Sequence, residues 1–168
     1  MSRVRYKAVI FALMIAIGGA VYSNSLQNGY HFDDIHYIVG NPYITSLKNI
    51  PLFFTDTRTL SRSPEFQFHY RPLLLTSYAV NYYFGRLRPA GYHLGNLLFH
   101  IGSAFLVFLM VRAMLQGDSG FFPALSAGLI FLVHPFNTET VNYIWARSSV
   151  MCAFFYLLAF WCWMKYRA

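Results

Sequence analysis

Four apolar segments separated by polar loops are the feature that most constrains the fold of this 168-residue chain. About 20 apolar residues suffice to cross a bilayer as a helix, because its hydrocarbon core is about 30 Å thick. We therefore predict an all-α integral membrane protein with about four transmembrane helices. The predicted spans are about residues 8–24, 91–114, 120–134 and 148–165.

The composition is too apolar for a soluble domain: 57% of the residues are hydrophobic and only 11% are charged, against about 25% charged in an average globular chain. The net charge is +7, but the basic residues form no run that would bind nucleic acid. Arg3, Arg5 and Lys7 precede the first apolar segment, and Lys165 and Arg167 end the chain. Such flanks are typical of segments that face the cytoplasm and anionic headgroups. We expect membrane lipid as a partner and no nucleic acid.

The first apolar segment, Ala8 to Tyr22, is short for a span, and Gly18-Gly19-Ala20 supplies small residues of the kind found at signal-peptide cleavage sites. It is therefore either the first span or a signal peptide. Both interpretations place the residues that follow on the outer side of the membrane.

Two loops are predicted on that outer side, about residues 25–90 and 135–147. Five of the six carboxylates fall in them, namely Asp33, Asp34, Asp56, Glu65 and Glu139. The longer loop contains two segments that we expect to lie as helices on the membrane interface, one around Ile44 to Ile50 and one from Leu73 to Phe84. The second of these contains Tyr78, Tyr82 and Tyr83, and tyrosines are typical of interfacial helices.

A polar stripe crosses the second predicted span. His93, Asn96 and His100 recur at spacings that place them on one helical face. Polar side chains within a membrane face protein or water rather than lipid. A transporter that uses this stripe is an alternative function, but four spans without a repeat or an intramembrane acid are poorly suited to a pump.

Adjacent carboxylates at Asp33 and Asp34 are the first candidate site. Such a pair can hold a divalent cation, or one carboxylate can act as a general base beside the other. The structural alternative is that Asp33 caps a short helix from about Asp34 to Val39, which Asn41-Pro42 ends.

The second outer loop adds Glu139 and His134 on the same side of the membrane. Glu139 is either a second acid or a favourable charge at a helix start, and His134 is either a ligand or a phosphate partner. Arg71 and Arg147 are the natural cations for a phosphate, with anchoring to lipid headgroups as the alternative.

Several motifs in this order resemble the membrane O-mannosyltransferases that carry tetratricopeptide repeats, and their bacterial relatives. The motifs are Phe32-Asp33-Asp34 through Asn41-Pro42, Tyr70-Arg71-Pro72-Leu73, Gly91-Tyr92-His93-Leu94 with Asn96, His134-Pro135 with Thr138-Glu139, and Arg147-Ser148. These enzymes are GT-C glycosyltransferases, so the resemblance implies a partial GT-C fold, with residues 1–168 as a single N-terminal transmembrane module.

The resemblance implies transfer of a mannose-like sugar from a polyprenyl-phosphate donor to a hydroxyl acceptor on the extracytoplasmic face, the acceptor being a protein or a glycan. Catalytic roles would fall to Asp33, Asp34 and Glu139, and a divalent metal could be held by Asp34 and Glu139. Substrate or phosphate binding would fall to Arg71, His134, Arg147 and His93.

The family members continue through further spans and helical repeats, which this sequence does not contain. The alternative to an enzyme, or the N-terminal fragment of one, is therefore a non-catalytic truncated membrane protein or a partner-binding subunit of the same fold. We expect a multi-pass protein of the bacterial inner membrane rather than of the endoplasmic reticulum.

Overall fold

The computed structural model describes residues 3–67, 69–115 and 117–167, and these residues form helices and turns without a strand. The α-helices are α1 (Arg3–Val21), α2 (Ile50–Phe53), α3 (Pro72–Gly85), α4 (Pro89–Met114), α5 (Phe121–Val133), α6 (Thr138–Asn142) and α7 (Arg147–Arg167). The shorter turns are Ser23–Gln27, Ile35–Val39, Tyr43–Thr45, Leu47–Asn49, Thr57–Leu60, Pro64–Phe66, Asp118–Gly120, Pro135–Asn137 and Ile144–Ala146. The prediction of an all-α chain is confirmed.

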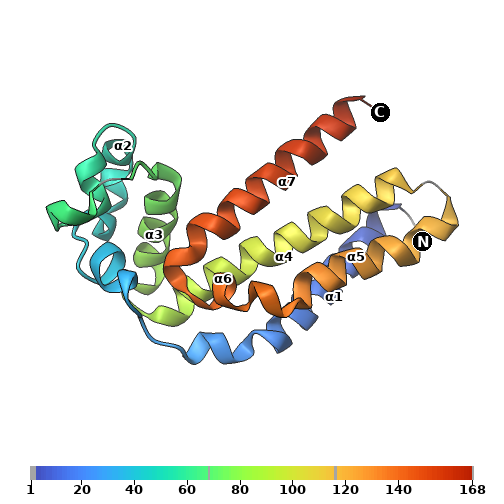
Figure 1. Ribbon diagram of the computed structural model, residues 1–168, viewed down its shortest axis with the longest axis horizontal. Helices are drawn as coiled ribbons and strands as arrows, with labels where there is room; N and C mark the ends of the chain where they lie inside the picture. The colour runs from blue at the N-terminus through green and yellow to red at the C-terminus, as the bar shows by residue number, and fades with distance from the viewer. Residues whose placement is uncertain (1–2, 68, 116, 168) are drawn as a thin grey trace.

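Helices α1, α4 and α5 lie side by side as an elongated bundle, and α7 starts beside α4 and diverges from it toward the C-terminus (Figure 1). Close packing of this bundle depends on Gly128 of α5. A Cβ atom there would lie 2.6 Å from Cε of Met14 and 3.0 Å from the backbone oxygen of Ala104. The apolar core that joins the three helices includes Ile10, Met14, Leu97, Ile101, Phe108, Ala124 and Leu132.

Residues 30–85, called here the loop lobe, gather at one end of the bundle, opposite the end where α1 begins and α7 ends (Figure 1). The lobe has its own core, which also takes in residues of α4, α7 and the second loop. That core includes Tyr37, Ile38, Ile44, Phe53, Leu60, Leu75, Tyr78, Tyr92 and Ile144. Ile44 and Tyr78 are fully buried, so these residues of the two expected interfacial helices pack against protein. Tyr83, in the same helix as Tyr78, is 63% exposed, and an interfacial position for the two helices stays a prediction.

By length and composition, two of the described helices could cross a membrane, Pro89–Met114 and Ile144–Arg167. A third span is possible if α5 and the following segment, which bend by 43° at His134, count as one. Within the described residues α1 is not among these candidates. The span predicted at residues 8–24 stays a prediction.

The polar stripe of the second predicted span faces protein, as expected. His93, Asn96 and His100 are all buried. Asn96 donates from Nδ2 to the backbone oxygen of Tyr143 at 2.9 Å, and Nε2 of His100 lies 2.9 Å from the backbone oxygen of Leu132. The stripe therefore attaches α4 to the chain segments around it.

Candidate functional site

The two predicted outer loops meet at Asp34. Its carboxylate accepts hydrogen bonds from the backbone N–H of His31 at 3.0 Å and of Trp145 at 2.8 Å, one on each oxygen. Its side chain is only 1% exposed. Burial raises the pKa of the Asp34 carboxyl above its usual value, while the two backbone hydrogen bonds act against this rise. Asp34 therefore fastens the loop lobe to the second loop.

Asp33 lies beside it but in a different environment. It is half-buried, and its Oδ2 accepts a hydrogen bond of 3.0 Å from the hydroxyl of Tyr143. Burial and this hydrogen bond raise the pKa of Tyr143 to about 12, so the phenol remains protonated at neutral pH and continues to donate. The turn that follows, Ile35–Val39, has no side-chain cap, so the expectation that Asp33 caps it is wrong.

The backbone just before the acid pair is strained. Phe32 has a φ of 46°, in the left-handed region that residues other than glycine seldom adopt, and its side chain is 87% exposed. Strain of this kind persists only where surrounding contacts hold it, and it is enriched at functional sites. Here the contacts are those of Asp33 and Asp34 with the second loop.

An aromatic stack connects the acid pair to Arg71. The rings of Tyr37 and Trp145 are parallel within 7° with centroids 3.6 Å apart, and the guanidinium carbon of Arg71 lies over the Trp145 ring, 5.1 Å from its centroid. Burial raises the pKa of Tyr37; the charge of Asp33 raises it further and that of Arg71 opposes this. The charges of Asp33 and Arg71 thus shift the pKa of the Tyr37 phenol in opposite directions.

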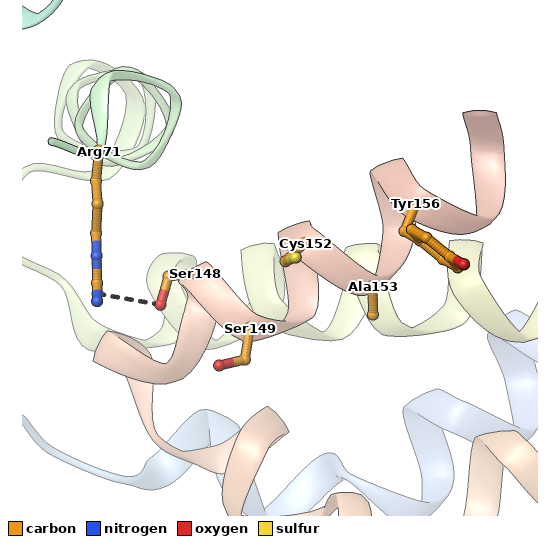
Figure 2. A pocket seen from close by; sticks show the side chains of 6 residues that line it. All are labelled: Arg71, Ser148, Ser149, Cys152, Ala153 and Tyr156. Carbon is orange, nitrogen blue, oxygen red and sulfur yellow. Dashed lines mark hydrogen bonds between the residues drawn. The ribbon is translucent and has the colours of Figure 1, made fainter. Parts of the chain in front are cut away.

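Arg71 stands at the mouth of a cavity of about 710 Å³ between the start of α3 and α7. Figure 2 shows its side chain reaching from α3 toward Ser148 at the start of α7, where Nη1 donates to the hydroxyl at 3.2 Å. The wall continues along α7 through Ser149, Cys152, Ala153 and Tyr156. A cation and a hydroxyl therefore lie at one end of a largely apolar surface.

Arg147 is also held by polar groups, but it is fully enclosed, with 1% of its surface exposed. Its guanidinium donates to Oδ1 of Asn96 at 2.8 Å and Oδ1 of Asn81 at 2.6 Å, and also to the backbone oxygen of Tyr92. The Tyr78 ring packs against it, with Cζ 4.7 Å from the ring centroid. All these partners are neutral, so Arg147 joins α3, α4 and α7 and presents little surface to a ligand.

Glu139 and His134 are both exposed, and within the described residues no hydrogen bond joins either side chain to Asp33 or Asp34. Glu139 lies in the first turn of α6 and lines a second cavity with Phe136 and Thr140, and Ser149 borders both this cavity and that of Arg71. Nδ1 of His134 accepts a local hydrogen bond from the backbone of Phe136. Over residues 3–67, 69–115 and 117–167, no group of three or more His, Cys, Asp or Glu side chains could hold a metal ion.

His93 lies inside the fold, with 1% of its surface exposed and no hydrogen-bond partner on either ring nitrogen within the described structure. The hydroxyls of Tyr30 and Tyr92 are also buried without a hydrogen-bond partner within the described structure. These two rings pack edge to face with centroids 5.8 Å apart. His93 is thus not at the surface of the Arg71 cavity, and a role in binding phosphate stays a prediction.

The sequence interpretation missed Tyr143, Trp145 and Ser148 as site residues. Tyrosine and tryptophan beside a predicted span resemble membrane anchors, so their contacts with Asp33, Asp34 and Arg71 had no local signal. Ser148 is part of the Arg147-Ser148 motif, and its place in that motif was the one sequence signal that could have marked it as a site residue.

Comparison with known proteins identifies relatives but no solved counterpart. The chain is 36% identical to the protein O-mannosyl-transferase tmtc2 of Xenopus laevis over 158 residues, which is 92% of this chain and 18% of that protein. It is 32% identical to Tmtc1 of Drosophila melanogaster over 86% of this chain and 17% of that protein. It is 32% identical to human TMTC4 over 83% of this chain and 20% of that protein. No protein-family model and no solved structure matches.

The chain therefore spans at most one fifth of the length of these relatives. They are animal proteins and give no support to the bacterial inner membrane that we expected from the sequence. Over most of its length, this chain is homologous to one part of the TMTC protein O-mannosyl-transferases.

Proposed function

We propose that this chain carries the acid and the phosphate-binding part of a membrane glycosyltransferase. The enzyme would transfer a mannose-like sugar from a polyprenyl-phosphate donor to a hydroxyl group of a protein acceptor. The relatives' names support the sugar and the acceptor. The observation that carries the proposal is the cationic Arg71 at the end of an apolar cavity, connected through Trp145 to the acid pair.

The donor phosphate is assigned to Arg71. A guanidinium has five N–H donors, and the described structure uses one of them, on Ser148. The remaining donors suit phosphate oxygens. The first turn of α7, with Ser148 and Ser149, adds backbone N–H groups at a helix N-terminus, which favours anions. The apolar wall along α7 suits a prenyl chain, so headgroup and tail each have a matching surface.

Asp33 is assigned as the general base and Asp34 as the residue that positions it. Both oxygens of Asp34 already accept backbone hydrogen bonds, whereas Asp33 is half-buried and uses only Oδ2 within the described residues. In the reaction, Asp33 would accept the proton of the acceptor hydroxyl as its oxygen bonds to the anomeric carbon. The bond between that carbon and the phosphate oxygen breaks, and Arg71 stabilises the phosphate that leaves.

A divalent metal shared by Asp34 and Glu139 does not fit this geometry. Asp34 is buried with both oxygens engaged, and Glu139 is exposed on α6 and lines a different cavity. We therefore derive no step through a metal ion. Glu139 as a second acid is retained as part of the proposal, at the surface where a polypeptide acceptor could reach it.

We also propose that α1 is a fourth span, so that the chain starts and ends on the cytoplasmic side and the loop lobe faces the opposite compartment. The position of the lobe, opposite the start of α1 and the end of α7, supports this arrangement (Figure 1).

The proposal is tested by sugar transfer from a polyprenyl-phosphate mannose in membranes that contain the protein, with Arg71→Gln as the variant. We expect the rate to fall by about a hundredfold, the loss typical of removing one group that stabilises developing charge. Arg88→Gln, an exposed arginine at the start of α4, is the matched control and should retain the wild-type rate. Full activity of Arg71→Gln would overturn the phosphate assignment.

A further inference from the structure

We propose that Trp145 is a positioning residue whose indole ring holds Arg71 in the orientation that binds the lipid phosphate. This inference rests on the proposed function, because it concerns how the phosphate site is built. It assigns to the ring a separate task from that of the Trp145 backbone, which is already engaged by Asp34.

The first support is how few contacts hold Arg71. An arginine side chain has several rotatable bonds and loses about 2 kcal/mol of rotamer entropy when it is fixed. Within the described structure its guanidinium has one hydrogen bond, to Ser148, and the Trp145 ring at 5.1 Å. The aromatic face is therefore one of two restraints on the cation.

The second support is that the ring is itself fixed. Tyr37 stacks on it with centroids 3.6 Å apart and planes within 7°. A ring packed in this way against Tyr37 and under Arg71 is not free to stack on a sugar. Its position therefore suits the orientation of the cation rather than contact with the substrate.

The third support is that the backbone around Trp145 is anchored without help from its ring. Tyr78 donates from its hydroxyl to the backbone oxygen of Ile144 at 3.0 Å, and Asn96 donates to that of Tyr143 at 2.9 Å. Asp34 accepts from the Trp145 N–H. Removing the ring should leave the loop backbone in place while it releases Arg71.

The experiment measures binding of two probes to the purified protein in detergent, farnesyl phosphate and the neutral alcohol farnesol. The ratio of the two affinities isolates recognition of the phosphate from binding of the prenyl chain. The variants are Trp145→Leu, Trp145→Met (which fills space without an aromatic face), Trp145→Phe and Arg71→Gln.

We expect wild type to prefer farnesyl phosphate and Arg71→Gln to lose that preference. Trp145→Leu and Trp145→Met should reduce the preference by about three- to tenfold, the range expected for a lost cation–π contact, with farnesol binding unchanged. Trp145→Phe, which restores an aromatic face, should recover most of the preference.

The results that would overturn the proposed function differ from those that would overturn only the role of Trp145. If wild type binds both probes equally, the phosphate site of the proposed function is overturned. If wild type prefers the phosphate and both Trp145→Leu and Trp145→Met keep that preference, the positioning role of Trp145 alone is overturned. Equal losses for farnesyl phosphate and farnesol would show a purely structural role, and would also overturn the inference. If Trp145→Leu does not fold, Trp145→Met and Trp145→Phe decide the question by the same ratio.

Discussion

Asp34 and Trp145, 111 positions apart in sequence, are joined by a hydrogen bond of 2.8 Å from the tryptophan N–H to the aspartate carboxylate. Asp34→Ala removes the acceptor for this N–H and for that of His31. A buried donor left without a partner costs about 1–3 kcal/mol, so we expect the free energy of unfolding to fall by about 2 kcal/mol. Asp56→Ala, which removes an exposed ion pair with Arg58 and the cap of the Thr57–Leu60 turn, should cost less because these groups are exposed to water. Denaturant titration in detergent compares the two, and equal losses would contradict the assignment.

Stability should also depend on pH through Asp34. Burial raises the pKa of this carboxyl in the folded state, so folding favours its protonated form. Its contribution to stability is therefore fully present below the ordinary aspartate pKa of about 3.9 and is lost as pH rises through the raised value. Relative to Asp34→Asn, which cannot titrate, wild type should lose melting temperature as pH increases from about 4. The prediction is contradicted if the difference in melting temperature between wild type and Asp34→Asn does not change with pH, or if it shifts in favour of wild type as pH rises.

Arg147→Gln should be strongly destabilising although no carboxylate partner is found for Arg147 in the described structure. The change leaves the acceptors on Asn96, Asn81 and Tyr92 without a donor. With each buried unsatisfied group costing about 1–3 kcal/mol, we expect a loss of about 3 kcal/mol or more. Arg58→Gln, at the surface, serves as the control in the same thermal unfolding assay, and a loss as small as that of the control would show that Arg147 is not structural.

Gly95→Ala tests the close packing of α4 against the Arg147 guanidinium. A Cβ atom at residue 95 would lie 2.7 Å from Nη2 of Arg147, and that group cannot move without breaking its hydrogen bond to Tyr92. We expect a lower melting temperature, by several degrees. In the same helix, Gly91→Ala meets only Nδ2 of Asn81, at 4.0 Å, and should be nearly neutral. Comparable effects of the two changes would contradict this packing.

Asp33→Asn should separate catalysis from stability. We expect the sugar-transfer rate to fall by about 10²- to 10⁴-fold, as for loss of a general base. The Tyr143 hydroxyl can still donate to the amide oxygen, so the melting temperature should change little. If the rate is retained, or if the melting temperature falls as far as in Asp34→Ala, the assignment of the base to Asp33 is wrong.

The helices could be predicted because they depend on patterns along the chain. The apolar run ending at Met114 and the polar stripe of His93, Asn96 and His100 are local signals, and the structure confirms the helix and the buried stripe. The different environments of Asp33 and Asp34, one half-buried and one fully hydrogen-bonded, could not be predicted. They depend on Tyr143 and Trp145, more than 100 positions away, whose side chains read equally well as membrane anchors.

The different roles of the two arginines could not be predicted from the sequence either. Arg71 and Arg147 have equivalent sequence signals, since each stands at the start of an apolar helix, α3 and α7 respectively. Only the fold distinguishes them, because Asn81 and Asn96 enclose Arg147 while Arg71 faces a cavity. Glu139 is exposed on α6 and lines a cavity of its own with Phe136 and Thr140, so its role as a second acid stays a prediction.

The contacts of Arg147 also have a consequence for the order of assembly. Its hydrogen-bond partners Ser77, Asn81, Tyr92 and Asn96 all precede it in the chain, as Asp34 precedes Trp145. During synthesis from the N-terminus, every acceptor exists before the arginine leaves the ribosome, but none is satisfied until it arrives. The contacts that join α3 and α4 to the start of α7 therefore form late, once Arg147 has been made, and a chain interrupted before residue 147 would leave these buried acceptors without their donor.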